Sequence, residues 1–346
     1  MIRQFLAGAA LAALASPALA DHMGPSGLGS GSGLAVFSPD TLDEGHGGIG
    51  LRLVYTRPEH RSDAELEDLA GDHIHAHNTD YNLNASAGIA YGVTHELTLS
   101  AELPYIRRDD LREGEHSHSG GGAVNTVERL GTVAGIGDLD LLAKYRLTGE
   151  EGLRFAVVGG IKVPTGSTHK RDLEGERLET EHQPGTGSWD PIAGASAAIK
   201  AGAIQLTASA LYQFSGKGAQ DTRLGDRFQG GISISHHFGP DAPDHHDDGE
   251  EHGHHDHEHQ HAPQHGHDSW DAFLELGGEW EGRQEIAGEV EQASGGSWLY
   301  AAPGVRFNSA SGWSAGGAIA IPVRQRIRDT HPDNRFRLMI SLGKAF

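Results

Sequence analysis

The sequence predicts an all-β protein, a transmembrane antiparallel up-and-down β-barrel of about 12 strands. Three observations predict it. The chain begins with an export signal, about twelve later segments alternate apolar and polar residues, and the last of these segments ends on the terminal residue, Phe346. In a barrel strand one face meets lipid and the other meets the lumen, which produces this alternation. The 50 glycines among 346 residues, and the lack of a second long apolar stretch, fit the same class.

Residues 1–20 are predicted to be a cleavable signal peptide. Arg3 supplies a positive start, an apolar run covers residues 5–15, and residues 18–20 read Ala-Leu-Ala, the small residues of a cleavage site. The apolar run is too short to span a bilayer as a helix. We therefore expect export from the cytoplasm and a final location in the bacterial cell outer membrane.

Residues 21–45 are predicted to form a flexible N-terminal segment. Residues 24–33 are rich in Gly and Ser, a composition typical of flexible linkers. The segment is expected either to extend into the periplasm or to fold into the lumen as a partial plug. The chain has no cysteine, so disulfides and a lipid anchor through cysteine are excluded.

The barrel is predicted to cover residues 46–346. Each of its candidate strands is long enough to cross a bilayer, for which about ten tilted residues suffice. The even number agrees with the rule for bacterial barrels. The candidate strands are 46–58, 79–93, 95–108, 134–147, 152–165, 188–201, 203–216, 224–238, 269–284, 296–309, 312–327 and 334–346.

The charged faces of these strands are expected to line the lumen, because a charge facing lipid near the bilayer centre costs about 2–4 kcal/mol. Opposed acids and bases inside a barrel either cross-link its wall or form a selectivity filter, and the sequence leaves both open. The candidate lumen charges are Asp138, Asp140, Lys144, Arg146, Glu102, Arg154 and Lys162. Aromatic residues near strand ends are expected to form girdles at the membrane surface: Tyr105, Trp280, Trp298, Tyr300 and Trp313.

The connections sort by length onto two sides. The short connections are 94, 148–151, 202 and 310–311, which are expected to be periplasmic turns. The long ones are expected to be external loops: 59–78, 109–133, 166–187, 217–223, 285–295 and 328–333. The histidine-rich loop 240–268 is an exception, because it is long and strand parity places it in the periplasm.

The last strand and the net charge indicate the partners. A terminal aromatic on an amphipathic strand, here Phe346, resembles the signal read by the bacterial barrel-assembly machinery. The other expected partners are outer-membrane lipid and a small-molecule solute. The formal net charge of −21 argues against nucleic acid, since phosphate binding needs a basic surface.

Three pieces of sequence carry a resemblance to a known family. They are 135–146 (GIGDLDLLAKYR), 162–166 (KVPTG) and 185–191 (GTGSWDP), and the Gly-Pro-Ser-Gly at 24–27 fits too. In this order they resemble a bacterial outer-membrane family named for the meta-pathway of phenol degradation, whose members are usually called transporters. The resemblance implies a membrane barrel with an uptake role and no catalytic residues.

Histidine is the most unusual component, with 24 in the chain. Neutral imidazole ligates transition metals and carboxylates complete such sites. We predict that the clusters bind Zn, Cu, Ni or Co, although no cofactor is required; a solvated linker that binds metals only weakly is the other interpretation. Ligation by histidine is expected to weaken as the pH falls through about 6.5. The candidate ligands are His245, His246, His252, His254, His255, His257, His259, His261, His265, His267, His73, His75, His77, His116 and His118.

Two functions are therefore compared. The first is a passive channel or transporter for small solutes, including hydrophobic or aromatic compounds. The alternative is a metal-linked outer-membrane protein whose histidine-rich loop captures ions near the pore or for an efflux partner. An enzyme is not expected, because three motif-like matches, 312–316 (Gly-x-Ser-x-Gly), 257–261 (His-Glu-x-x-His) and 45–50 (Gly-x-Gly-x-x-Gly), lack the helices that these motifs require.

Overall fold

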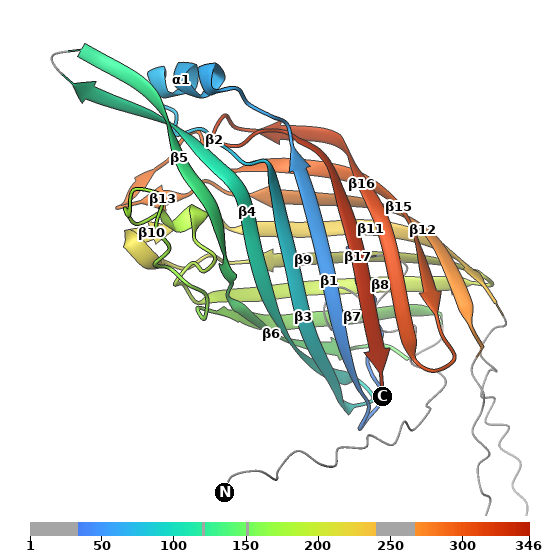
Figure 1. The fold of residues 1–346 in the computed structure, drawn as a ribbon. Helices are drawn as coiled ribbons and strands as arrows, with labels where there is room; N and C mark the ends of the chain where they lie inside the picture. Colours follow the sequence, from blue (N-terminus) through green and yellow to red (C-terminus); the bar gives the residue numbers. More distant parts are fainter. Residues whose placement is uncertain (1–33, 120–121, 150–151, 240–266) are drawn as a thin grey trace, which may run out of the picture.

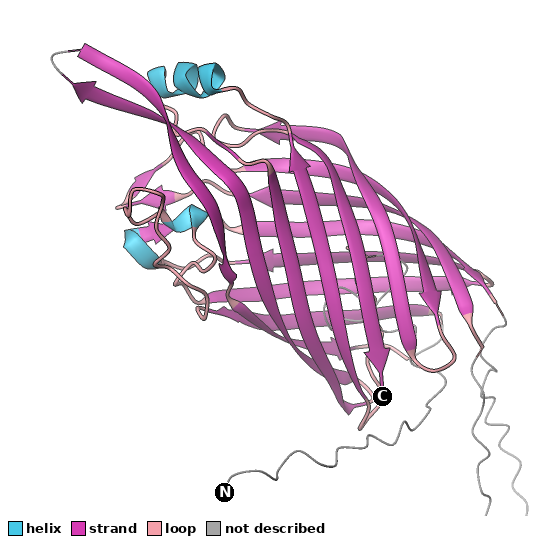
Figure 2. Ribbon diagram, in the orientation of Figure 1, coloured by secondary structure: helices cyan, strands magenta, loops and turns pink. Residues whose placement is uncertain are grey.

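The structure is a computed structural model that describes residues 34–119, 122–149, 152–239 and 267–346 (Figure 1). Strands dominate it (Figure 2) and enclose a single lumen. Within the described residues, no helix is long and apolar enough to cross a membrane.

The described residues form a closed antiparallel barrel of 12 strands, as the sequence predicts. The strand β1 pairs with both β3 and β17, so the sheet has no free edge. The strands β5 and β6 both pair with β4 and together make one wall strand, interrupted at Gly137 and Asp138. The barrel strands are β1 (Gly47–Pro58), β3 (Tyr81–Thr94), β4 (Leu97–Ser119), β5 (Gly122–Ile136) with β6 (Leu139–Arg146), β7 (Leu153–Val163), β8 (Asp190–Ala201), β9 (Ile204–Gln213), β11 (Arg227–Phe238), β12 (Ser269–Glu281), β15 (Gly296–Asn308), β16 (Trp313–Ile327) and β17 (Asn334–Ala345).

The smaller elements all lie in connections at one end of the barrel, which we call the long-loop end; the opposite, short-turn end carries the C-terminus (Figure 1). They are α1 (Asp63–Gly71), β2 (His77–Asn78), the 3₁₀ helices η3 (Thr180–His182) and η4 (Ala219–Asp221), and the short strands β10 (Thr222–Arg223), β13 (Glu285–Ile286) and β14 (Glu289–Val290). Helix α1 begins with a capping box, in which Ser62 and Glu65 satisfy each other's backbone N–H groups.

The segment 109–133 is not the loop that the sequence analysis expects. It continues β4 and β5 as a hairpin that projects from the long-loop end (Figure 1). The reason is a small apolar cluster at its base, in which Leu111, Leu130 and Val133 are buried together with Leu178. Helix α1 covers the hairpin beyond this cluster, with Leu66 fully buried.

The outer face of the barrel is apolar, and the inner face is polar and packed. On β12, for example, Trp270, Leu274 and Leu276 are exposed while Asp271 and Glu275 are buried. Alternating side chains of one strand point to opposite faces, so exposed apolar residues mark the lipid side.

The expectation that five aromatic residues lie in a girdle at the membrane surface is wrong for two of them. Tyr105, Trp280 and Trp313 are exposed on the outer face. Tyr300 is buried, however, and Trp298 packs against the same lumenal cluster of apolar side chains. The two residues share their face of β15 with the buried Arg306, which is why they point inward.

Candidate functional site

Two adjoining cavities occupy the lumen. The first, of about 460 Å³, lies toward the long-loop end and is lined by loop and wall residues including His77, His182 and Glu279. The second, of about 380 Å³, is lined by Phe37, Leu142 and other residues deeper in the barrel. Residues common to both linings, among them Asn84, Arg108 and Arg227, make the two spaces neighbours. The lumen is thus the candidate site, and two chain segments limit it.

The first of these segments, residues 34–43, is called the strap here. Its backbone is held by side chains of the wall. The Glu275 carboxylate accepts hydrogen bonds from the N–H groups of Ala35 (2.9 Å) and Val36 (2.8 Å). Near the short-turn end, Thr98 accepts a hydrogen bond from the N–H of Leu42 at 2.8 Å. The strap therefore descends from the middle of the lumen to the short-turn end.

Side chains of the strap also pack and pair inside the barrel. Leu34 is buried beside Tyr300 and Met339, and Phe37 is buried beside Leu142. Asp40 forms an ion pair with Arg154 at 2.6 Å. These contacts bury both apolar and charged groups, so the strap is an integral part of the lumen. The sequence leaves two places open for residues 21–45, the periplasm and the lumen. Residues 34–43 lie in the lumen, and residues 21–33 lie outside the described part of the chain.

The second segment, residues 164–189, is called the inward loop. Its ends are fixed by a buried charge cluster built from the sequence pieces that carry the family resemblance. The Asp138 carboxylate accepts hydrogen bonds from the N–H groups of Gly166 (2.9 Å) and Thr186 (2.8 Å). Lys162 lies 3.2 Å from Asp138 and 2.6 Å from Asp190. One cation between two carboxylates thus joins the wall to both ends of the loop.

The two ends of the inward loop also cross in direct contact. A Cβ atom at Gly185 would lie 2.4 Å from the carbonyl carbon of Gly166, closer than any side chain tolerates. Glycine is therefore required at this crossing, which accounts for the spacing of the 162–166 and 185–191 motifs.

The remaining lumen charges predicted from the sequence also face inward. Asp140 and Glu102 line the second cavity, as do Asp138 and Lys162. Lys144 donates a hydrogen bond to the carbonyl of Ser38 at 3.2 Å, and Arg146 donates one to the carbonyl of His95 at 2.9 Å. Most of these charges have partners in the wall, the strap or the inward loop. Their contacts therefore cross-link the barrel wall and the two segments inside it.

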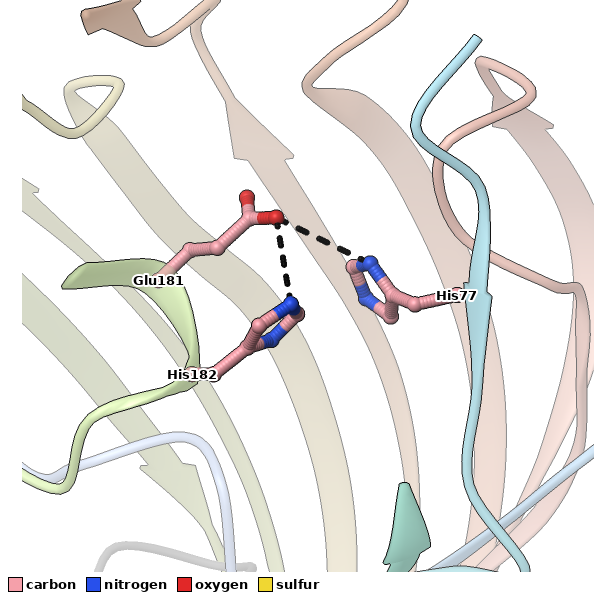
Figure 3. Close-up of side chains that lie close together, drawn as sticks. All are labelled: His77, Glu181 and His182. Atoms are coloured by element: carbon pink, nitrogen blue, oxygen red, sulfur yellow. Dashed lines mark ion pairs between the residues drawn. The ribbon is translucent and has the colours of Figure 1, made fainter. Parts of the chain in front are cut away.

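A cluster of histidines and carboxylates lies where the inward loop meets the long-loop end. Figure 3 shows His77 of β2 and His182 of the loop directed at the same oxygen of Glu181. That oxygen lies 3.7 Å from Nδ1 of His77 and 3.7 Å from Nε2 of His182. His182 also approaches Glu113 of β4, with Nε2 and Oε2 3.3 Å apart, and His331 lies 2.9 Å from Nε2 of His77.

Burial shifts the pKa values of the loop groups in this cluster. Burial, with the neighbouring His331, holds the pKa of His77 well below its ordinary value. Burial likewise lowers the pKa of His331 to about 4 and raises that of Glu181 to about 7. Unlike the other two histidines, His75 has a raised pKa, because its hydrogen bond with Glu113 raises it to about 9. At neutral pH His77 and His331 are therefore uncharged.

The structure separates the histidines predicted as metal ligands. His75 and His77 enter this cluster, whereas His73 stacks edge-on against His116 at 4.4 Å between ring centroids. His267 is exposed. The other candidates of the tract, and the side chain of His118, lie outside the described residues: His245, His246, His252, His254, His255, His257, His259, His261 and His265.

Sequence reasoning missed His182, His331 and the carboxylates Glu113 and Glu181. His331 is a lone histidine and His182 stands only beside Glu181, in loops far apart along the chain, so no local spacing marks them. The Ser62–Glu65 capping box was a readable signal for helix α1, which supports β4 beside this cluster.

Two solved structures are similar to this chain, and the first of them supports the fold. An outer membrane channel from Pseudomonas putida F1 superposes with a TM-score of 0.57 at 15% identity, over 89% of this chain and 98% of that one. The toluene transporter TodX of P. putida gives a TM-score of 0.40 at 11% identity, over 88% of this chain and 91% of that one. No curated protein matches the sequence.

A family model confirms the resemblance read from the sequence. The model described as "Putative MetA-pathway of phenol degradation" matches residues 68–262. That range covers more than half of the chain and contains the three motifs described above. The chain belongs to this family of outer-membrane barrels.

Proposed function

We propose that the protein is a passive outer-membrane channel for small solutes. The observation that carries the proposal is the pair of adjoining cavities, about 460 and 380 Å³, inside a closed barrel with an apolar outer surface. A barrel filled only by packed side chains would leave no such space.

The solutes that fit best are small aromatic compounds. The second cavity has an apolar wall that includes Phe37, Leu142 and Leu211, and its polar wall carries both cations, such as Arg108, and carboxylates, such as Asp140. An apolar cavity of roughly 150 Å³ already accepts benzene, so the volume suffices for one ring. Binding sites of this kind combine apolar walls with a few oriented polar groups.

Flux through proteoliposomes tests this proposal, with benzoate as the aromatic solute and gluconate as the comparison. Phe37→Ala enlarges the apolar part of the lumen, so benzoate flux is expected to rise severalfold. Phe155→Ala is the matched control, because Phe155 lies on the outer face. Benzoate flux equal to that of protein-free liposomes would refute a channel for this class of solute.

The export and assembly of the protein are part of the proposal. A signal peptide at 1–20 would deliver the chain to the periplasm, and the assembly machinery would recognise the last strand. Phe346 exchanges two backbone hydrogen bonds with Gly47, at 2.7 and 2.9 Å, where the last strand of the barrel meets the first. With the C-terminus in the periplasm, the long-loop end faces outward. Phe238 and Ser269, which flank 240–268, lie at the short-turn end.

No catalytic role is proposed. The match at 312–316 falls on a turn and the first residues of β16, and the match at 45–50 leads into β1, so neither has the helix that its motif needs. The match at 257–261 lies outside the described residues. Capture of metal by the tract, the alternative function, has no support from the comparisons; deleting 240–267 and measuring metal accumulation in cells tests it.

A further inference from the structure

We infer that the cluster at the long-loop end is a binding site for one divalent transition-metal ion of the zinc class. Its ligands are His77, Glu181 and His182, whose ligand atoms lie together, with Glu113 beside His182 as the fourth. The bound ion would fasten the inward loop, through Glu181 and His182, to β2 and β4 of the barrel. This site is separate from the histidine-rich tract 240–268.

The distances between the ligand atoms fit a tetrahedral ion. Ligands about 2.0–2.2 Å from zinc lie roughly 3.3–3.6 Å from one another in a tetrahedron. The atoms of His77, Glu181 and His182 that face each other are 3.7 Å apart in two pairs. Nε2 of His182 and Oε2 of Glu113 are 3.3 Å apart. The ligand atoms of His77, Glu181 and His182 all lie within 4.8 Å of one another and are therefore spaced to share one ion. Glu113, which groups with Glu179 and His182, would have to turn toward them to become the fourth ligand.

One of the ligand atoms has no hydrogen-bond partner in the described part of the chain. Nδ1 of His77 is buried and makes no hydrogen bond among the described residues. When Nε2 of His77 donates its hydrogen bond to His331, Nδ1 carries a lone pair directed toward Glu181 and His182. A buried nitrogen without a hydrogen bond is costly, and an ion would remove that cost.

Second partners orient three of the four ligands, as is usual at metal sites. His331 contacts the far ring nitrogen of His77. Gln284 donates a hydrogen bond to the other carboxylate oxygen of Glu181 at 2.7 Å, and His75 lies 3.6 Å from the other oxygen of Glu113. These three partners come from three separate connections at the long-loop end.

The ion can reach the site from the lumen. His77, Glu181, His182 and His331 line the 460 Å³ cavity, and His182 itself is only 1% exposed. The neighbouring cation Arg108 donates hydrogen bonds to the backbone carbonyls of His182 (3.2 Å) and Gln183 (3.4 Å), while the His182 imidazole faces the carboxylates.

Anomalous X-ray diffraction at the zinc edge, on crystals of the full chain equilibrated with zinc, locates the ion directly. We expect a peak between His77, Glu181 and His182. A map with zinc only elsewhere, or with none, would overturn it. Because this experiment uses the unaltered protein and measures no flux, its failure is distinct from failure of the proposed channel.

Competition with a chelator in detergent solution measures the same site by stoichiometry. His77→Gln and His182→Gln are each expected to lose one tight zinc equivalent, while His95→Gln, an exposed histidine at the short-turn end, loses none. His331→Phe keeps an aromatic ring at this position but removes the hydrogen bond to His77. The zinc affinity of the site is therefore expected to fall about 10–100-fold. Equal stoichiometry in all variants that show the heat-modifiable mobility of a folded barrel would contradict the inference.

Discussion

Two segments fill the lumen, and they are held in different ways. The strap, residues 34–43, is anchored by many separate contacts to side chains from distant strands, such as Glu275, Arg154 and Thr98. The inward loop, residues 164–189, is anchored at its two ends by the single cluster of Asp138, Lys162 and Asp190. Its middle reaches the histidine cluster.

The difference indicates separate roles. The loop is joined to β7 and β8 at its ends, so it can shift but cannot leave the lumen. The strap is joined covalently to β1 at its C-terminal end, and within the described residues noncovalent contacts hold the rest of it in place. The strap is therefore the segment whose removal changes the width of the path most, and the loop is the one that an ion at its middle can fix in place.

Removal of the strap is expected to have the largest effect. Deleting residues 34–43 takes Leu34, Val36 and Phe37 out of the lumen, so single-channel conductance in planar bilayers is expected to rise severalfold. Deleting residues 24–33 instead leaves the strap in place and serves as the control. Unchanged conductance after the first deletion would show that the inward loop alone limits the path.

Asp138→Asn tests the anchoring of the loop. Removing one charge from the buried cluster leaves Lys162 with a single carboxylate and weakens the contacts to Gly166 and Thr186. The free energy of unfolding is expected to fall by about 3 kcal/mol. Urea unfolding of the refolded barrel measures it, with Glu176→Gln on the exposed part of the loop as control. Full stability combined with a changed ion preference would instead identify Asp138 as a selectivity filter.

Glu275→Gln is expected to have the smallest effect, because the amide oxygen still accepts hydrogen bonds from the strap. The loss of charge-assisted bonds to Ala35 and Val36 costs about 1 kcal/mol. The expected result is greater fluctuation of the open-channel current with little change in mean conductance. Glu285→Gln in a loop is the control. Current noise identical to that of the unaltered protein would show that the strap does not depend on this carboxylate.

Much of the fold is readable from the sequence because strand faces are a local property. The alternation of side chains predicts ten of the twelve wall strands within a few residues at both ends. For the other two it finds only the part inside the barrel wall, because β4 continues to Ser119 and β5 already begins at Gly122. The same rule applied to β15 would have placed Trp298 and Tyr300 beside Arg306 in the lumen, and the expectation of a girdle overrode it. The 109–133 hairpin was missed because its extended form depends on Leu178 and helix α1, which lie elsewhere in the chain.

The sequence by itself determined the family, the barrel and the inward direction of its charged faces, since each follows from neighbouring residues and a repeat of two. Only the tertiary structure decided what fills the lumen. Glu275 meets Ala35 across 240 positions, and His77 meets His331 across 254. Such contacts depend on closure of the whole sheet, which no local pattern encodes, so the strap and the histidine cluster appear only once the barrel is assembled.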